Sequence, residues 1–206
     1  MSTSPSLIAT IKSKINNLLR IEKPWIGRII KYIWIAFLCF VIGFPLYIYT
    51  VKIDLFGLYG AMPSTLEVEN PENDLSSEVI SADGVSLGRY YRGANRSQVH
   101  FEDLSEDLVN TLIYSEDHRF FEHSGLDFPA YLRVIYGILT LNPQGGGSTI
   151  TQQLAKNLYT MNPDKSLDGH LAKLGKYPRR IIQKTKEWII SIQLEENFTK
   201  EEIIAM

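Results

Sequence analysis

The sequence is poor in the residues that build disulfide and metal frameworks. Cys39 is the only cysteine among the 206 residues, which excludes an intrachain disulfide framework. There is no CxxC motif and no cluster of Cys and His, so a structural zinc site is not expected. The 21 basic and 23 acidic residues nearly balance. This balance excludes a uniformly basic nucleic-acid binder, although it leaves room for a local basic patch.

One stretch of the chain lacks charge altogether. Residues 32–51 are 20 residues without Asp, Glu, Lys or Arg, and a helix of that length spans about 30 Å, the hydrocarbon thickness of a bilayer. Residues 1–31 carry six basic side chains and one acidic one, whereas residues 52–79 carry one basic and six acidic. The positive-inside rule therefore predicts a cytoplasmic basic tail (1–31), a transmembrane helix (32–51) and an extracytoplasmic remainder.

A buried core helix or a signal peptide fits this apolar stretch less well. A core helix seldom stays apolar on all sides for so long. A cleaved signal peptide needs a small-x-small site after the apolar run, and none is present. The roughly 150 residues that follow suffice for one ordinary domain.

The extracytoplasmic part is expected to begin with a linker and a hairpin. Residues 52–77 contain many Pro, Ser, Asn and Glu and show no helical apolar period, which predicts a linker. Asp83-Gly84 lies between two short apolar runs and predicts a β-hairpin.

Beyond the hairpin, apolar residues recur at helical spacing. A capping box predicts that Asp103 begins a first helix, and Asp127 is expected to begin a second. This second helix is expected to turn four apolar side chains toward the core, namely Phe128, Leu132, Ile135 and Leu139.

Three further helices are expected in the rest of the chain. Ser148 follows a glycine-rich break and is expected to cap the third, residues 180–196 form the fourth, and Thr199 begins the fifth with a capping box. Because the fifth helix is unfinished at Met206, we expect a longer natural protein.

The densest polar cluster, residues 115–125, directly follows the first helix. Glu116 lies where the negative end of the helix dipole disfavours a carboxylate, and desolvation there would raise its pKa. A general acid or base needs such a carboxylate, although a solvated charged loop accounts more simply for the cluster alone. His118 and His123 are five residues apart, which does not suit a helical metal pair.

A glycine-opened helix and a basic island follow. Residues 145–147 are three glycines whose backbone N–H groups are free to face an anion, and Ser148, Gln152 and Lys156 share one helical face beyond them. The Walker pattern is absent. Residues 165–186 carry seven basic side chains against one acidic, which suggests an anionic ligand. A flexible turn and a solvated loop are the alternatives. Together these features suit transfer chemistry on a membrane-borne, phosphate-containing substrate.

At the level of motifs, the chain resembles the lysozyme-like peptidoglycan glycosyltransferases of class A penicillin-binding proteins and of monofunctional enzymes. Residues 116–125 resemble the family motif EDxxFxxHxG, and residues 146–157 resemble GGSTITQQxxKN. Residues 183–187 resemble RKxxE, with Gln183 where arginine is usual. Residues 200–206 resemble the start of a fourth motif.

The resemblance implies a mainly α fold over residues 78–206, a lysozyme-like domain with a small N-terminal β-hairpin behind a single transmembrane helix. It implies polymerisation of lipid II into glycan strands with release of undecaprenyl diphosphate. Glu116 would be the general base, and Glu187 would assist at the diphosphate. The implied substrate-binding residues are Asp117, Phe120, Ser148, Thr149, Gln152, Lys156, Asn157, Arg179, Lys184 and Lys186.

The resemblance also implies surroundings for the reaction. No cofactor is expected to bind tightly, although a divalent cation, Mg²⁺ or Mn²⁺, would fit at the diphosphate with Glu187 as its ligand. The expected partners are lipid II, the growing strand, the bacterial cytoplasmic (inner) membrane and other cell-wall synthesis proteins, and no nucleic acid. A lysozyme-like hydrolase or lytic transglycosylase, or a non-catalytic membrane-anchored scaffold, are the alternatives.

Overall fold

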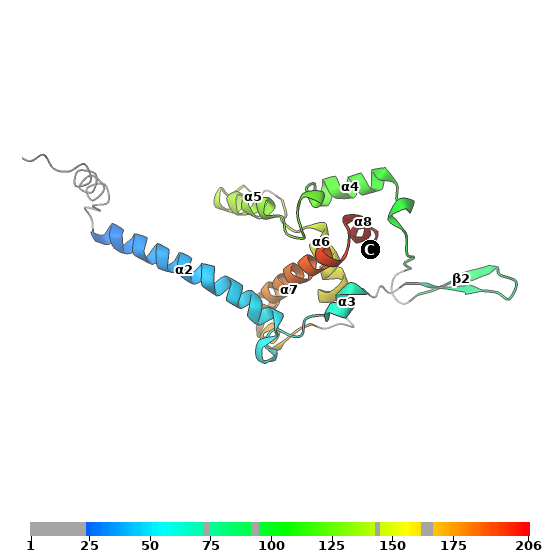
Figure 1. Ribbon diagram of the computed structural model, residues 1–206, viewed down its shortest axis with the longest axis horizontal. Coiled ribbons are helices and arrows are strands. Elements are labelled where there is room, and N and C mark those ends of the chain that lie inside the picture. The colour runs from blue at the N-terminus through cyan, green and yellow to red at the C-terminus, as the bar shows by residue number, and fades with distance from the viewer. Residues whose placement is uncertain (1–23, 72–74, 92–94, 143–144, 162–166) are drawn as a thin grey trace, which may run out of the picture. The chain divides into compact units, whose positions relative to one another are not determined.

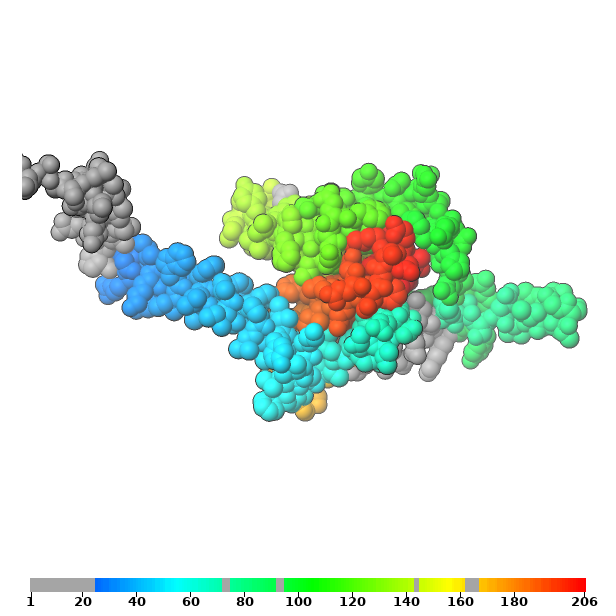
Figure 2. All heavy atoms as spheres, viewed as in Figure 1, coloured from blue at the N-terminus to red at the C-terminus, as the bar shows by residue number. Residues whose placement is uncertain are grey.

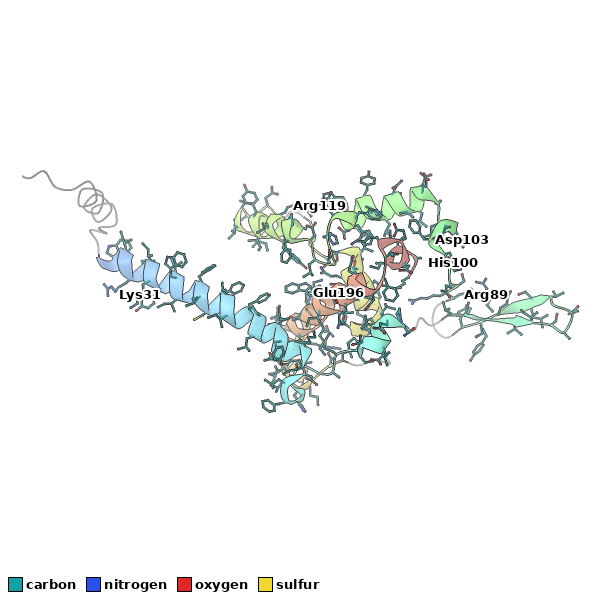
Figure 3. All side chains as sticks on the ribbon, viewed as in Figure 1. Lys31, Arg89, His100, Asp103, Arg119 and Glu196 are labelled. Atoms are coloured by element: carbon teal, nitrogen blue, oxygen red, sulfur yellow. The ribbon has the colours of Figure 1, made fainter. Side chains whose placement is uncertain are left out.

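The computed structural model describes residues 24–71, 75–91, 95–142, 145–161 and 167–206. The chain divides into two compact units, residues 1–49 and 50–206, which are described separately. Most of the predicted basic tail, up to Lys23, lies outside the described residues. Its last residues belong to the first helix, on which Lys31 is labelled in Figure 3.

The long helix α2 (Pro24–Lys52) contains the charge-free stretch and begins eight residues before it. Residues Trp25–Lys52 are long and apolar enough to cross a membrane. Most of the apolar side chains along this helix are exposed (Figure 3), although Val51 near its end is buried. A helix with these properties fits a membrane anchor or a signal sequence.

The expected linker, residues 52–77, contains two short helices, η1 (Leu55–Gly57) and α3 (Thr65–Glu69). Ser64 and Glu67 form a capping box at the start of α3. Val68 is the one buried residue of this helix and belongs to the core. A helix of five residues is too short to display an apolar period, so only the capping box of Ser64 and Glu67 could have predicted α3 from the sequence.

The predicted hairpin is confirmed. Strands β1 (Ser77–Ile80) and β2 (Ser86–Tyr90) are antiparallel, with a bulge next to Ile80. Gly84 has a φ of 81° in the connecting turn, a conformation that favours glycine. Every residue of both strands is exposed, so the hairpin contributes little to the core.

Helices form the rest of the unit (Figure 1). In chain order they are η2 (Phe101–Asp103), α4 (Glu106–Glu116), η3 (Phe120–Glu122), α5 (Phe128–Leu139), α6 (Ile150–Ala155), the π-helical turn η4 (Lys156–Thr160), η5 (His170–Leu174), α7 (Lys176–Asn197) and α8 (Lys200–Ala205). Helix α7 is the central element, because α3, α6, η4, η5 and α8 all contact it.

Two apolar clusters stabilise this arrangement. One joins α3, α6, η4 and α7 through Val68, Ala155, Leu158, Tyr159, Ile190 and Leu194. The other joins α4, η3, α6 and α8 through Val109, Ile113, Phe120, Ile150 and Ile203. Helix α6 is common to both, so its orientation is fixed from two sides.

Two helix caps, at Asp127 and Thr199, are confirmed, and two others differ from expectation. Ser105, not Asp103, caps α4, since the Ser105 side chain accepts a hydrogen bond from the backbone N–H of Leu108. Asp103 lies in η2, where its carboxylate accepts a hydrogen bond from the backbone N–H of His100 (Asp103 and His100 are labelled in Figure 3). Thr149, not Ser148, caps α6. Helix α7 begins at Lys176, four residues earlier than expected.

The prediction that α5 turns its large apolar side chains inward was wrong. Phe128, Leu132, Ile135 and Leu139 are between 51% and 78% exposed. The buried residues of α5 are the small Ala130 and Gly137. In Figure 2 the yellow-green surface of α5 lies along one border of the unit. An apolar period shows that a helix has an apolar face, but not that the chain covers it.

Candidate functional site

A cleft of about 850 Å³ lies between α6, η4 and the first half of α7. Its lining residues are Ser148, Gln152, Gln153, Lys156, Thr160, Met161, Leu167, Asp168, Lys176, Arg179, Arg180, Gln183, Lys184 and Glu187. Five of them are basic and two are acidic. A concave site with this excess of positive charge favours an anionic ligand.

Gly125 fixes the start of α6 beside this cleft. Its carbonyl accepts hydrogen bonds from Thr149 Oγ1 at 2.7 Å and from Gln152 Nε2 at 3.0 Å. Gly125 has a φ of 83°, and a Cβ there would lie 2.8 Å from the carbonyl oxygen of Ser191. Only glycine fits this contact between the motif loop and α7. Thr149 is therefore a buried cap rather than a cleft residue, whereas Gln152 is buried and also reaches the cleft.

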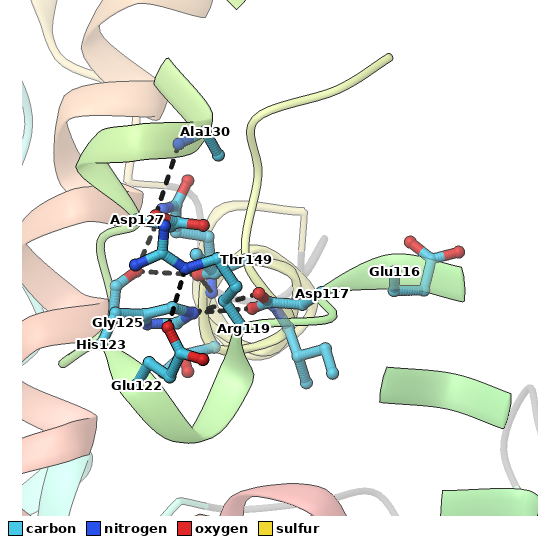
Figure 4. Close-up of polar contacts among 12 residues, drawn as sticks. Glu116, Asp117, Arg119, Glu122, His123, Gly125, Asp127, Ala130 and Thr149 are labelled. Atoms are coloured by element: carbon cyan, nitrogen blue, oxygen red, sulfur yellow. Dashed lines mark hydrogen bonds and ion pairs between the residues drawn. The ribbon is translucent and has the colours of Figure 1, made fainter. Parts of the chain in front are cut away.

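The two neighbouring carboxylates of the motif at residues 116–125, those of Glu116 and Asp117, lie in different surroundings. Asp117 is buried, its oxygens lie 3.0 and 3.1 Å from His123 Nε2, and it accepts a hydrogen bond from the backbone N–H of Ile150. Figure 4 shows Asp117 turned toward His123 and Glu116 turned away. Asp117 thus joins the end of α4 to the start of α6. We expected it to bind substrate, but it does not line the cleft.

Phe120 does not reach the cleft either. Its ring is fully buried in the second apolar cluster, and Lys200 Nζ lies 4.2 Å from the ring centroid. The motif pattern indicates that an aromatic residue belongs at this position, but it does not distinguish a residue that contacts substrate from one that supports the loop.

Glu116 ends α4, as predicted, and its carboxylate is exposed rather than desolvated. Gln153 Nε2 donates a hydrogen bond of 2.7 Å to Glu116 Oε2. Because Gln153 also lines the cleft, this bond holds the Glu116 carboxylate at the border of the cationic site. The carboxylate retains free acceptor positions for a further hydrogen bond.

A second carboxylate lies among the cations of the cleft. Glu187 is 7% exposed, and its Oε2 lies 3.0 Å from Lys184 Nζ. The same ammonium donates a hydrogen bond of 2.9 Å to Ser148 Oγ. Lys184 therefore connects the motif on α6 to the motif on α7.

The far wall of the cleft holds an additional ion pair. Arg179 lies 2.7 Å from Asp168, which also accepts a hydrogen bond of 3.4 Å from Gln183 Nε2. Gln183 stands where the family pattern has arginine, and here it lines the cleft beside Arg179.

Two of the expected binding residues lie elsewhere. Asn157 lines a separate hollow next to Leu158 and Phe198. Lys186 is fully buried, and its ammonium donates to the carbonyls of Gly60, Ala61 and Leu167. Residues two apart on a helix do not share a face, so helical spacing is the signal that could have separated Lys186 from Lys184 in the predicted set.

The structure therefore gathers half of the predicted set around the cleft. These residues are Ser148, Gln152, Lys156, Arg179, Lys184 and Glu187. Sequence reasoning missed Gln153, Lys176 and Arg180. The latter two share a helical face with Lys184 at spacings of four. The late predicted start of α7 concealed Lys176, whereas the spacing of Arg180 from Lys184 was readable within the predicted helix.

Among the described residues, no group of three or more His, Cys, Asp or Glu is placed to hold an ion, around Glu187 or elsewhere. Glu187 itself is paired with Lys184. A divalent cation at the diphosphate with Glu187 as its ligand therefore stays a prediction, and no step is assigned to one.

Known proteins similar to this chain agree with the motif pattern. A model of the transglycosylase family matches residues 83–206. Penicillin-binding protein 1F of Bacillus subtilis (strain 168) is 34% identical over 132 residues, which cover 64% of this chain and 16% of that protein. Penicillin-binding protein 1A of Streptococcus pneumoniae (strain ATCC BAA-255 / R6) is 30% identical over 192 residues, 89% of this chain and 23% of that protein.

Penicillin-binding protein 1A of Escherichia coli (strain K12) is 27% identical over 157 residues, 74% of this chain and 17% of that protein. The chain thus spans about a fifth of the length of these curated relatives. The family match covers the hairpin turn, the cleft and every motif residue discussed above. The chain belongs to the transglycosylase family and is homologous to the glycosyltransferase region of class A penicillin-binding proteins.

Proposed function

We propose that this chain is a peptidoglycan glycosyltransferase that joins lipid II units into β-1,4 glycan strands and releases undecaprenyl diphosphate. The observation that carries this proposal is the Glu116 carboxylate, tied by Gln153 to the border of a cleft lined by five basic side chains. A base beside a cationic cleft suits the transfer of a sugar from a diphosphate to a hydroxyl group.

Glu116 is the general base in this mechanism. Its exposed carboxylate accepts the proton of the acceptor sugar's 4-hydroxyl, and the oxygen attacks the anomeric carbon of the lipid-linked donor with inversion. The bond between that carbon and the diphosphate oxygen breaks, and its electron pair leaves with the diphosphate. Gln153 orients the carboxylate by its 2.7 Å hydrogen bond.

The cations of the cleft stabilise the departing diphosphate. The diphosphate gains negative charge as it leaves, and the cleft offers five cations to that charge, namely Lys156, Lys176, Arg179, Arg180 and Lys184. Glu187 holds Lys184 through their ion pair. Lys186, which the motif pattern places among these cations, is fully buried and bonded to three carbonyls, so it is not part of this proposal.

The apolar helix α2 supports a place at the membrane. Its length suits a single-pass anchor, and the charges on its two sides favour a cytoplasmic N-terminus with an extracytoplasmic catalytic domain. Because the relatives are penicillin-binding proteins several times longer than this chain, we also propose that it acts as the glycosyltransferase region of such a protein, alongside other cell-wall synthesis proteins.

The two alternatives account for less of the site. A lysozyme-like hydrolase or lytic transglycosylase acts on a finished glycan and has no diphosphate to bind, so it leaves the five basic side chains unexplained. A scaffold protein without activity leaves unexplained why Gln153 holds a carboxylate at the border of a cationic cleft.

Glu116→Gln in the full chain, assayed with lipid II in detergent micelles, tests the proposal. Loss of a general base should reduce strand synthesis by about 10²–10⁴-fold. Glu122→Gln is the matched control, because Glu122 lies in the same segment, is exposed and pairs with Arg119 at the surface. Its rate should stay within about threefold of the wild type. A wild-type chain that does not consume lipid II, or a Glu116→Gln chain as active as the control, would overturn the proposal.

A further inference from the structure

Behind the far wall of the cleft lies a buried polar centre, which we call the lysine latch. It consists of Lys186 and the three carbonyl groups that its ammonium binds. Nζ lies 2.7 Å from the oxygen of Gly60, 3.2 Å from that of Ala61 and 2.5 Å from that of Leu167. An ammonium has three donors, so the three carbonyls satisfy it completely.

The latch joins two segments that are far apart in the sequence. Gly60 and Gly169 touch backbone to backbone: a Cβ on Gly60 would lie 2.3 Å from the oxygen of Leu167, and one on Gly169 would lie 2.2 Å from the nitrogen of Gly60. Leu171 N–H adds a hydrogen bond of 2.9 Å to the carbonyl of Leu58. No side chain larger than hydrogen fits at this crossing without a shift of the backbone.

The first of these segments, residues 54–61, is braced internally as well. Asp54 Oδ1 accepts hydrogen bonds from the backbone N–H groups of Tyr59, at 3.0 Å, and Gly60, at 2.7 Å. These bonds turn the carbonyls of Gly60 and Ala61 toward Lys186. The backbone of residues 54–61, which we call the platform, is thus held in place by internal hydrogen bonds.

The second segment contains Leu167, Asp168 and Gly169 and forms the far wall of the cleft, where Asp168 pairs with Arg179. The carbonyl of Leu167 belongs to the latch, and the side chains of Leu167 and Asp168 line the cleft. Asp168 in turn lies 2.7 Å from Arg179 and accepts from Gln183. A continuous set of contacts therefore runs from residues 54–61, through Lys186, to a cation of the cleft.

We propose that Lys186 is a positioning residue, whose three carbonyl contacts hold the cleft wall at Leu167 and Asp168 against residues 54–61 and thereby place Arg179 for the diphosphate of the donor. The inference rests on the proposed function for the identity of that donor. It adds residues 54–61, outside the matched family region, to the structure of the donor site.

Burial and two nearby carboxylates act on the charge of Lys186 in opposite directions. Burial opposes the ammonium and lowers the pKa of Lys186 to about 8, whereas Asp54 on the platform and Asp168 on the cleft wall favour it. The residue is therefore mainly charged at neutral pH and can serve all three carbonyls. Methionine has a similar length but no donor, so Lys186→Met leaves the three carbonyls without their partner.

Steady-state kinetics with lipid II can separate positioning from mere stability. For Lys186→Met in the full chain, well below its unfolding temperature, KM for lipid II should rise about tenfold while kcat stays within about threefold. Gly169→Ala disturbs the same crossing without changing any charge, and should shift KM in the same direction. Asp54→Asn keeps the shape and an oxygen acceptor, so it is the variant least expected to disturb folding, and should raise KM about two- to threefold.

Val68→Ala is the matched control. Val68 is fully buried in α3 near the platform in sequence, lies outside the latch and does not line the cleft. It should lower the unfolding temperature and leave KM unchanged. KM values for Asp54→Asn and Gly169→Ala equal to that of Val68→Ala would overturn the inference.

Hydrogen exchange tests the latch independently of activity. The amide of Leu171 should exchange faster in Lys186→Met, whereas the amide of Phe198, bonded to the carbonyl of Leu194, should keep its rate. Unchanged exchange at Leu171 would overturn the latch even in an active enzyme. A wild-type chain that shows protected Leu171 but does not consume lipid II would instead contradict the proposed function alone.

Discussion

Lys184 and Lys186 are two residues apart on helix α7, lie on opposite faces of the helix and have different surroundings. Lys184 lies on the cleft face, bonded to Ser148 and paired with Glu187. Lys186 lies on the opposite face, fully buried against three carbonyls. Two residues correspond to about 200° of rotation around a helix. The charge of a segment therefore does not reveal how many of its cations serve one site.

The basic island illustrates this point in full. Of its seven basic residues, Lys176, Arg179, Arg180 and Lys184 line the cleft, whereas Lys186 supports it from behind. Lys173 is exposed and does not line the cleft. Lys165 lies outside the described residues. The cations that line the cleft and the lysine that holds its wall in place thus lie along one helix, and variants of Lys184 and Lys186 separate the two roles.

Lys186→Met should have the largest effect on stability. Three buried carbonyls lose their donor, at roughly 1–3 kcal/mol for each unsatisfied group, although removing a buried charge offsets part of this cost. We expect the free energy of unfolding to fall by about 2–4 kcal/mol, measured by urea unfolding in mild detergent. Lys184→Met should cost less, because its side chain is 34% exposed. Equal losses for the two variants would remove the distinction between the faces.

Lys184→Met should have the next largest effect, on activity. Removing one fixed cation from the site of the leaving group should lower kcat/KM for lipid II about 10²-fold. Lys184→Arg keeps the charge and should retain most of the activity. If the methionine and arginine variants turn over lipid II equally fast, the role of Lys184 is not electrostatic.

Local signals predicted several of these elements from the sequence. The hairpin followed from Asp83-Gly84, and the caps of α5 and α8 followed from Asp127 and Thr199. Each depends on residues within a few positions of one another, so a single sequence contains the information. Most motif residues of the cleft were likewise identified, with the exception of Gln153, and so was the position of Glu116 at the end of α4.

Long-range contacts explain what the sequence did not predict. The contact between Gly60 and Gly169 joins segments more than a hundred residues apart, and neither glycine lies in a motif. Asp117, Phe120 and Thr149 lie within motifs, but their burial assigns them to the support of the loop and of α6. A motif marks the residues that a site needs, whereas only packing separates those that face the ligand from those that hold them.

The pH dependence of stability should sharpen the contrast between the two lysines. The pKa of Lys186 is near 8 in the folded chain and near 10.5 when unfolded. Between these values the unfolded chain binds more protons, so the free energy of unfolding of the wild type should rise with pH relative to Lys186→Met. From pH 8 to 9.5 this gain should be about 1–2 kcal/mol. Parallel curves for the two chains would show that Lys186 does not titrate in this window.

The smallest effect is expected on α5, whose apolar face contrasts with that of α4. Leu132 on α5 is 67% exposed, whereas Val109 on α4 is 9% exposed and belongs to the core. Leu132→Ala removes more carbon than Val109→Ala, yet little of that carbon is withdrawn from solvent by folding. We expect Leu132→Ala to change the free energy of unfolding by less than about 0.5 kcal/mol, and Val109→Ala to lower it by about 1–3 kcal/mol. Urea unfolding of both variants measures the difference. A loss at Leu132 as large as that at Val109 would mean that the apolar face of α5 is covered when the chain is folded.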